Sequence, residues 1–151
     1  MFALTLGAVW VAAQGAALAH CQVPCGIYGD GLRFDGMIEN VATISKAMRK
    51  IEELSADPSR NMNQITRWVL TKEEHADKVA HVMSWYFLQQ RIKTPRSSDR
   101  KARDRYLKLL ELAHRVLVKA MKCKQGTDQA AAEALEKAIR DFRGAYEQHG
   151  H

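Results

Sequence analysis

Four stretches of the sequence repeat their apolar residues every three or four positions. The first two span about residues 33–54 and 62–90, and the other two carry apolar faces over residues 106–120 and 131–146. This spacing is typical of one face of an α-helix, and no alternating pattern of useful length predicts a strand. Amphipathic helices joined by short polar connections predict an all-α fold, an up-and-down four-helix bundle.

Helix-breaking residues set the expected ends of the first two helices. Residues 29–31, Gly-Asp-Gly, are expected to break regular structure before the first helix. Asp57-Pro58 is expected to end that helix, because a residue that precedes proline is disfavoured in the helical conformation. Lys72 interrupts the apolar stripe of the second helix, and Pro95 follows the end of that helix.

An uncharged, apolar leader rich in alanine and glycine precedes the helices. It ends in Ala17-Leu18-Ala19, the small-x-small pattern after which signal peptidases cut. We expect residues 1–19 to be a cleaved leader and residues 20–151 to form the mature domain. An export signal would direct the protein to the periplasm, the cell exterior or an organelle lumen, and a processing protease would leave no stable membrane anchor.

Two other interpretations of the leader stay open. The missing basic start counts against an export signal and would fit a translation start further upstream. About 20 apolar residues can span a bilayer, so an uncleaved anchor is one alternative, although Gln14 and the many small residues weaken it. A propeptide removed in the cytoplasm by a dedicated protease is the other.

The formal net charge of +6 lies entirely on residues 20–151, because the leader carries no charge. A basic surface suits nucleic acid, an anionic membrane surface or a small anion. The most basic stretch, residues 91–105, lacks interleaved aromatic residues that could stack on bases, and no nucleic-acid motif surrounds it. We therefore expect a solvated loop and helix start there, and no nucleic-acid partner.

Three cysteines cannot all pair with one another. Cys123 lies far from the others in a helical pattern and is expected to be an ordinary helix-end thiol. Cys21 and Cys25 are four positions apart, and this spacing alone allows a metal site, a disulfide or two reduced thiols. A disulfide across so short a loop, with Pro24 inside it, would be strained.

Cleavage after Ala19 would change the chemistry of these two thiols. The new α-amine at His20 would have a pKa of about 7.7 to 8, so it could lose its proton and coordinate a metal near neutral pH. The backbone nitrogen of Cys21 would complete a five-membered chelate ring with that amine, and the thiolates of Cys21 and Cys25 would follow. Two nitrogens and two sulfurs in a plane suit Ni(II) or Cu(II).

The segment at residues 20–28 resembles the nickel hook of nickel-containing superoxide dismutases. It reads His20-Cys21-Gln22-Val23-Pro24-Cys25-Gly26-Ile27-Tyr28. The resemblance implies that His20 provides its α-amine and, in the oxidised state, its imidazole. It also implies that Cys21 provides its amide nitrogen and thiolate, that Cys25 provides its thiolate, and that the Tyr28 phenol stands near the open face of the metal.

The resemblance implies an enzyme that converts superoxide to dioxygen and hydrogen peroxide by cycling between Ni(II) and Ni(III), with one nickel ion per subunit in a homohexamer. A carboxylate on the first helix is expected to orient the His20 imidazole, as groups around a metal ligand usually do. Glu39 is the candidate, with Arg67 or His75 as its partner.

The sequence also leaves two hypotheses of other classes open. One is a non-enzymatic, exported nickel- or copper-binding helical protein that uses the same hook. The other is an interaction module in which a Cys21–Cys25 disulfide pins the N-terminus. Among the remaining histidines, His81 and His114 are expected to be structural.

Overall fold

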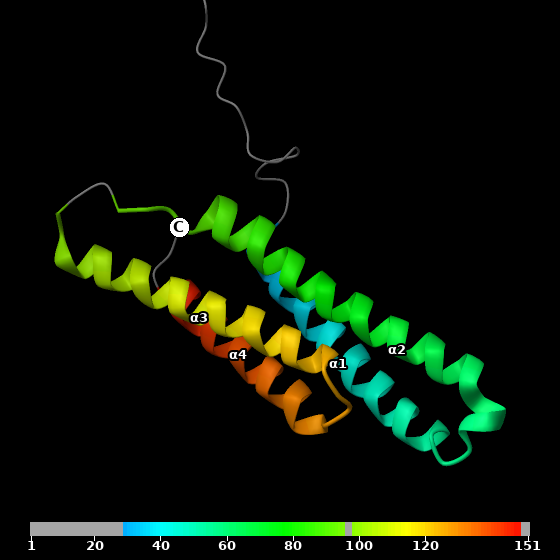
Figure 1. Ribbon diagram of the computed structural model, residues 1–151. Helices are drawn as coiled ribbons and strands as arrows, with labels where there is room; N and C mark the ends of the chain where they lie inside the picture. The colour runs from blue at the N-terminus through cyan, green and yellow to red at the C-terminus, as the bar shows by residue number, and fades with distance from the viewer. Residues whose placement is uncertain (1–28, 96–97, 149–151) are drawn as a thin grey trace, which may run out of the picture.

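A computed structural model describes residues 29–95 and 98–148 of the chain. Its elements are α1 (Asp30–Leu54), α2 (Pro58–His81), η1 (Val82–Arg91), α3 (Arg100–Lys124) and α4 (Gln129–Glu147). Helices that follow one another in the chain pack side by side, and α4 returns to α1 (Figure 1). Within the described ranges there is no strand, so the predicted all-α bundle is confirmed. None of these helices is long and apolar enough to cross a membrane.

The start of α1 differs from the prediction. Asp30 and Gly31, expected in an irregular segment, form the first residues of the helix, and extended Gly29 precedes them. A carboxylate at this place is favourable because it faces the positive end of the helix dipole. The helix therefore begins directly after the hook segment in the sequence.

The start of α2 also corrects the prediction. Asp57-Pro58 does not end α1, which stops at Leu54, but opens the next helix. The Asp57 carboxylate accepts a hydrogen bond from the backbone N–H of Arg60 at 3.3 Å, and Pro58 occupies the first helical position, where its missing N–H costs nothing. The second helix thus begins four residues before the expected Met62.

The second helical stretch reaches Arg91, close to its predicted end, but its last part is a π-helix. The element η1 continues α2 without a break. Its hydrogen bonds join residues five apart, as in the 2.8 Å bond from the N–H of Ile92 to the carbonyl oxygen of Phe87. Residues five apart, such as Tyr86 and Arg91, consequently lie above one another.

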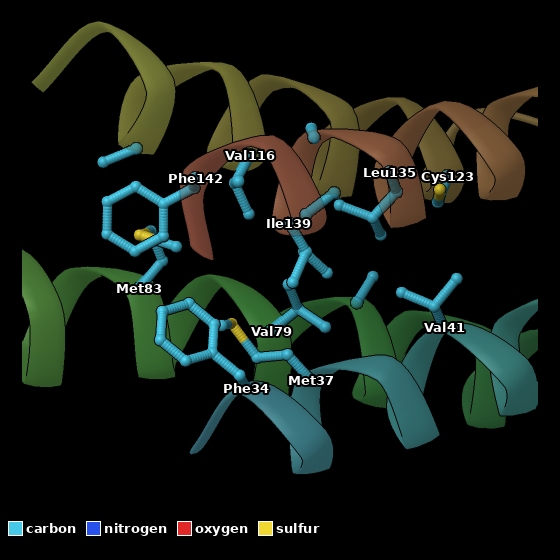
Figure 2. Close-up of a cluster of buried hydrophobic side chains, with 14 of the residues drawn as sticks. Phe34, Met37, Val41, Val79, Met83, Val116, Cys123, Leu135, Ile139 and Phe142 are labelled. Carbon is cyan, nitrogen blue, oxygen red and sulfur yellow. The ribbon is translucent and has the colours of Figure 1, made fainter. Parts of the chain in front are cut away.

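The core lies between the four helices, and the buried faces are those that the apolar spacing predicted (Figure 2). Cys123 is fully buried there, and burial raises the pKa of its thiol to about 11. This confirms the prediction of an ordinary structural thiol. The largest fully buried side chains are Phe34, Met37, Ile44, Met48, Val79, Met83, Phe87, Val116, Cys123, Leu135, Ile139 and Phe142.

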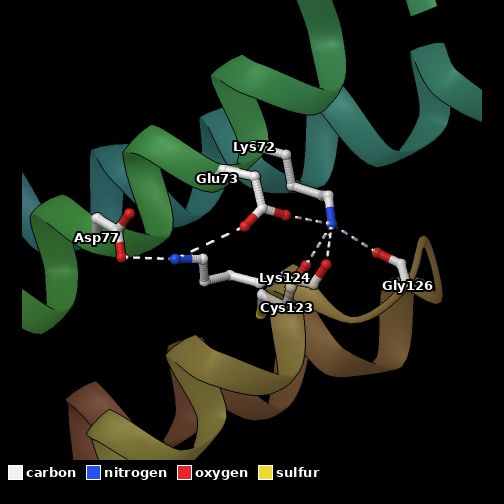
Figure 3. Close-up of polar contacts among 6 residues, drawn as sticks. All are labelled: Lys72, Glu73, Asp77, Cys123, Lys124 and Gly126. Atoms are coloured by element: carbon white, nitrogen blue, oxygen red, sulfur yellow. Dashed lines mark hydrogen bonds and ion pairs between the residues drawn. The ribbon is translucent and has the colours of Figure 1, made fainter. Parts of the chain in front are cut away.

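Lys72, which interrupts the apolar stripe of α2, is nevertheless buried, with 4% of its surface exposed. Its ammonium group donates to the carbonyl oxygens of Cys123 (3.0 Å), Lys124 (2.6 Å) and Gly126 (3.2 Å) (Figure 3). The last carbonyl groups of a helix have no partner within it and carry the negative end of its dipole. Lys72 therefore satisfies the C-terminal end of α3 from a neighbouring helix.

We expect a Lys72→Met variant to lose about 3 kcal/mol of unfolding free energy, since several carbonyl oxygens lose one charged donor. Chemical denaturation would measure the loss. Lys78→Met is the matched control, because Lys78 pairs with Glu74 on an exposed helix face and such pairs contribute little. Equal denaturation midpoints for both variants would contradict the role of Lys72.

Candidate metal centre

The predicted ligands His20, Cys21 and Cys25, together with Tyr28, lie outside the residues that the structure describes. Their roles stay predictions. The donor set fits nickel on chemical grounds, because thiolate and nitrogen donors suit a metal with a square-planar preference. Within the two described ranges, no group of three or more histidine, cysteine, aspartate or glutamate side chains could hold a metal ion.

The described structure begins just after the hook, where Asp30 joins three helices. Its Oδ2 atom accepts hydrogen bonds from Nη2 of Arg91 at 2.6 Å and from the Tyr146 hydroxyl at 2.7 Å. Its Oδ1 atom accepts a hydrogen bond from the Tyr86 hydroxyl. We call Asp30, Tyr86, Arg91 and Tyr146 the Asp30 cluster; it connects α1 with η1 and α4.

The charges of the Asp30 cluster support one another. Burial by itself would raise the pKa of Asp30, but hydrogen bonds from Arg91, Tyr86 and Tyr146 lower it below its usual value. Burial and the Asp30 carboxylate raise the pKa of Tyr86 to about 12 and also raise the pKa of Tyr146. At neutral pH the carboxylate is therefore ionised, and both phenols keep the protons that they donate to it.

Aromatic rings pack directly beneath the Asp30 cluster. The Phe34 ring, one turn along α1, lies 4.6 Å from the Phe87 ring and 5.7 Å from the Tyr146 ring. The Arg91 guanidinium lies 5.8 Å from the centre of the Tyr86 ring, a cation–π distance. Because these contacts come from α1, η1 and α4, the start of α1 is held on several sides.

Sequence reasoning missed this cluster. It placed Asp30 in an irregular segment and Arg91 in a solvated basic stretch, and it treated Tyr86 and Tyr146 as members of apolar faces. The prediction for Arg91 was wrong, because its guanidinium binds Asp30 instead of facing solvent alone. The available signal was that tyrosine on a buried face needs a partner for its hydroxyl group, but that signal names no partner.

The rest of the basic stretch matches the prediction of a solvated loop and helix start. In its described part, five basic side chains are exposed to solvent. These are Lys93, Arg100, Lys101, Arg103 and Arg105.

The structure describes the three residues that were expected to surround the His20 imidazole. Glu39 and Arg67 are exposed, and His75 is partly buried. Nδ1 of His75 lies 2.6 Å from Oδ1 of Asn40, so His75 pairs with the neighbour of Glu39 rather than with Glu39 itself. Burial and nearby Lys78 lower the pKa of His75. Any role of these residues toward His20 stays a prediction.

One known protein family matches nearly the whole chain. The family model for nickel-containing superoxide dismutase matches residues 15–150. No curated protein and no solved structure gives a significant match. The matched range includes the four described helices and residues 20–28, which carry the predicted metal ligands.

The chain belongs to the nickel-containing superoxide dismutase family. It is an oxidoreductase with a nickel cofactor, and it converts superoxide to dioxygen and hydrogen peroxide. Nothing in the comparisons favours the non-enzymatic alternative.

Proposed function

We propose that the dismutase reaction takes place at residues 20–28 after cleavage between Ala19 and His20. The α-amine of His20, the amide nitrogen and thiolate of Cys21 and the thiolate of Cys25 would then hold one nickel ion per subunit. The observation that carries the proposal is the family match, which begins before the hook and includes all of it.

Each hook residue has a distinct part in this proposal. When bound, nickel would supply one-electron chemistry between Ni(II) and Ni(III), and the thiolates of Cys21 and Cys25 with the Cys21 amide would favour the higher oxidation state. The His20 imidazole adds a nitrogen donor in the oxidised state. Tyr28 orders superoxide or water through its phenol and does not bind the metal. Pro24 and Gly26 would shape a turn that lets Cys25 reach the same metal ion as Cys21.

We also propose that the protein works as a homo-oligomer, a hexamer by resemblance to the family. Several large apolar side chains lie on the outer surface of the described helices, among them Leu32 (72% exposed), Met62 (59%) and Leu70 (62%). Burial of such side chains between subunits would remove apolar surface from water.

The apolar leader that ends in Ala17-Leu18-Ala19 supports the proposal that the protein is exported. The alternative is a propeptide that a dedicated protease removes in the cytoplasm.

The N-terminal residue and the metal content of the purified protein test the proposal together. We expect intact mass and N-terminal sequencing to show a chain that begins at His20. Elemental analysis should find one nickel ion per chain, and the same sample should dismutate superoxide. A fully active protein that still begins at Met1 would overturn the hook proposal, because its His20 would have no free α-amine.

A further inference from the structure

We propose that the Asp30 cluster is a positioning device for the nickel hook: it determines where residues 20–28 leave the bundle. This inference rests on the proposed function, which places nickel in that segment. The hook is joined covalently to the bundle at the start of α1, since Asp30 follows Tyr28 by only two residues. Whatever holds Asp30 therefore also limits the position of the hook.

The length of the connecting chain makes this limit tight. Cys25 precedes Asp30 by five residues, and a fully extended chain of that length spans at most about 18 Å. By the same reasoning, Tyr28 lies at most about 7 Å from Asp30 along the extended chain. A shift of Asp30 would consequently move the anchor of both the last proposed ligand and the proposed substrate-ordering phenol.

The cluster holds the first residue of α1 unusually well for a helix end. Helix ends generally fray, because their first N–H groups have no partner within the helix. Here the first residue accepts hydrogen bonds from two elements that are distant in sequence, η1 and α4. The bond to Arg91 at 2.6 Å is charge-assisted, and such bonds are about twice as strong as neutral ones.

The π-helical geometry of η1 is what lets two of its residues reach the same carboxylate. Tyr86 and Arg91 are five residues apart, and both donate to Asp30. In an α-helix, with 3.6 residues per turn, positions five apart point about 140° away from one another. In a π-helix they lie on one side. Such segments are rare and often occur at functional sites.

A metal centre with a planar ligand set depends on this kind of support. A displacement of about 1 Å from the productive geometry can lower a reaction rate by about 100-fold. Residues that hold a site correctly do so without touching the reacting atoms. We accordingly assign Asp30 a positioning role and not a catalytic one.

The test compares Asp30→Asn with wild type in the full, nickel-loaded protein. Asp77→Asn is the matched control: Asp77 also binds a cation on another helix, Lys124 at 2.7 Å, but at the C-terminal end of α3, far along the bundle from Asp30. The readouts are kcat/KM per bound nickel, the rate of nickel loss to a chelator, and the electron paramagnetic resonance spectrum of the oxidised metal.

For Asp30→Asn we expect kcat/KM per bound nickel to fall about 10- to 100-fold, nickel to leave faster and the resonance spectrum to change. The control should match wild type in all three. An Asp30→Asn protein that folds and keeps the wild-type spectrum and activity per nickel would overturn this inference alone. If a Cys25→Ser variant kept its nickel, the hook and the positioning device would both be wrong.

Tyr146→Phe is the second variant, which tests the positioning role of the Asp30 cluster if Asp30→Asn does not fold. This substitution removes one hydrogen bond to Asp30 and keeps the ring that packs against Phe34 and Phe87. A smaller change of the same kind in the spectrum and in nickel loss supports the inference. A spectrum and a rate of nickel loss identical to wild type contradict it.

Discussion

Replacing Cys25 with serine should abolish nickel binding and dismutase activity together. A serine hydroxyl stays protonated at neutral pH and is a hard oxygen donor, whereas a thiolate is the soft ligand that this ligand set requires. A change in a residue that supports a metal ligand typically lowers metal affinity or activity about 10- to 100-fold. Removal of a ligand itself should lower both by more than that. Elemental analysis and a superoxide assay on the same sample would measure both effects, and Cys21→Ser should behave alike.

Cys123→Ala is the control for these thiol substitutions. Cys123 is fully buried in the core on α3, so its loss should affect stability, by about 1 kcal/mol, and leave the nickel content unchanged. A Cys25→Ser protein with full activity would refute the assignment of Cys25 as a ligand. Equal loss of nickel in the Cys25 and Cys123 variants would point to unfolding instead.

The second large effect is expected from one extra residue before His20. If Ala19 is retained, the nitrogen of His20 becomes part of a peptide bond and is no longer an amine that coordinates near neutral pH. The new terminal amine lies one residue further away, so the five-membered chelate ring with Cys21 is lost. We expect nickel content and activity nearly as low as in Cys25→Ser.

A protein produced with His20 as its first residue, by precise removal of a fusion partner, is the matched control. It should bind one nickel ion per chain and be fully active without the natural leader. Mass spectrometry would verify both N-termini, and elemental analysis would compare their nickel contents. If the Ala19-extended protein bound nickel as well as the control, the α-amine would not be a ligand.

Two corrections in this protein concern polar residues next to apolar patterns. Asp57-Pro58 was expected to end a helix and instead begins one, because a capping carboxylate and an N-terminal proline both suit a helix start. Lys72 was taken as an interruption of the apolar stripe, yet its side chain is buried and its charge reaches the end of α3. The partners of Lys72 lie on a helix that is distant in the sequence, whereas the Asp57 cap and Pro58 were a local signal of a helix start that was interpreted as a helix end.

The sequence by itself determined the all-α fold, the buried face of each helix and the structural role of Cys123, because helical periodicity and apolar burial are local properties. It also contained the hook motif of the family. Only the tertiary structure decided that Asp30, Tyr86, Arg91 and Tyr146 meet at the start of α1. The nearest two of these are five residues apart and the farthest are separated by 116, so their hydrogen bonds depend on how the helices pack and on the π-helical form of η1.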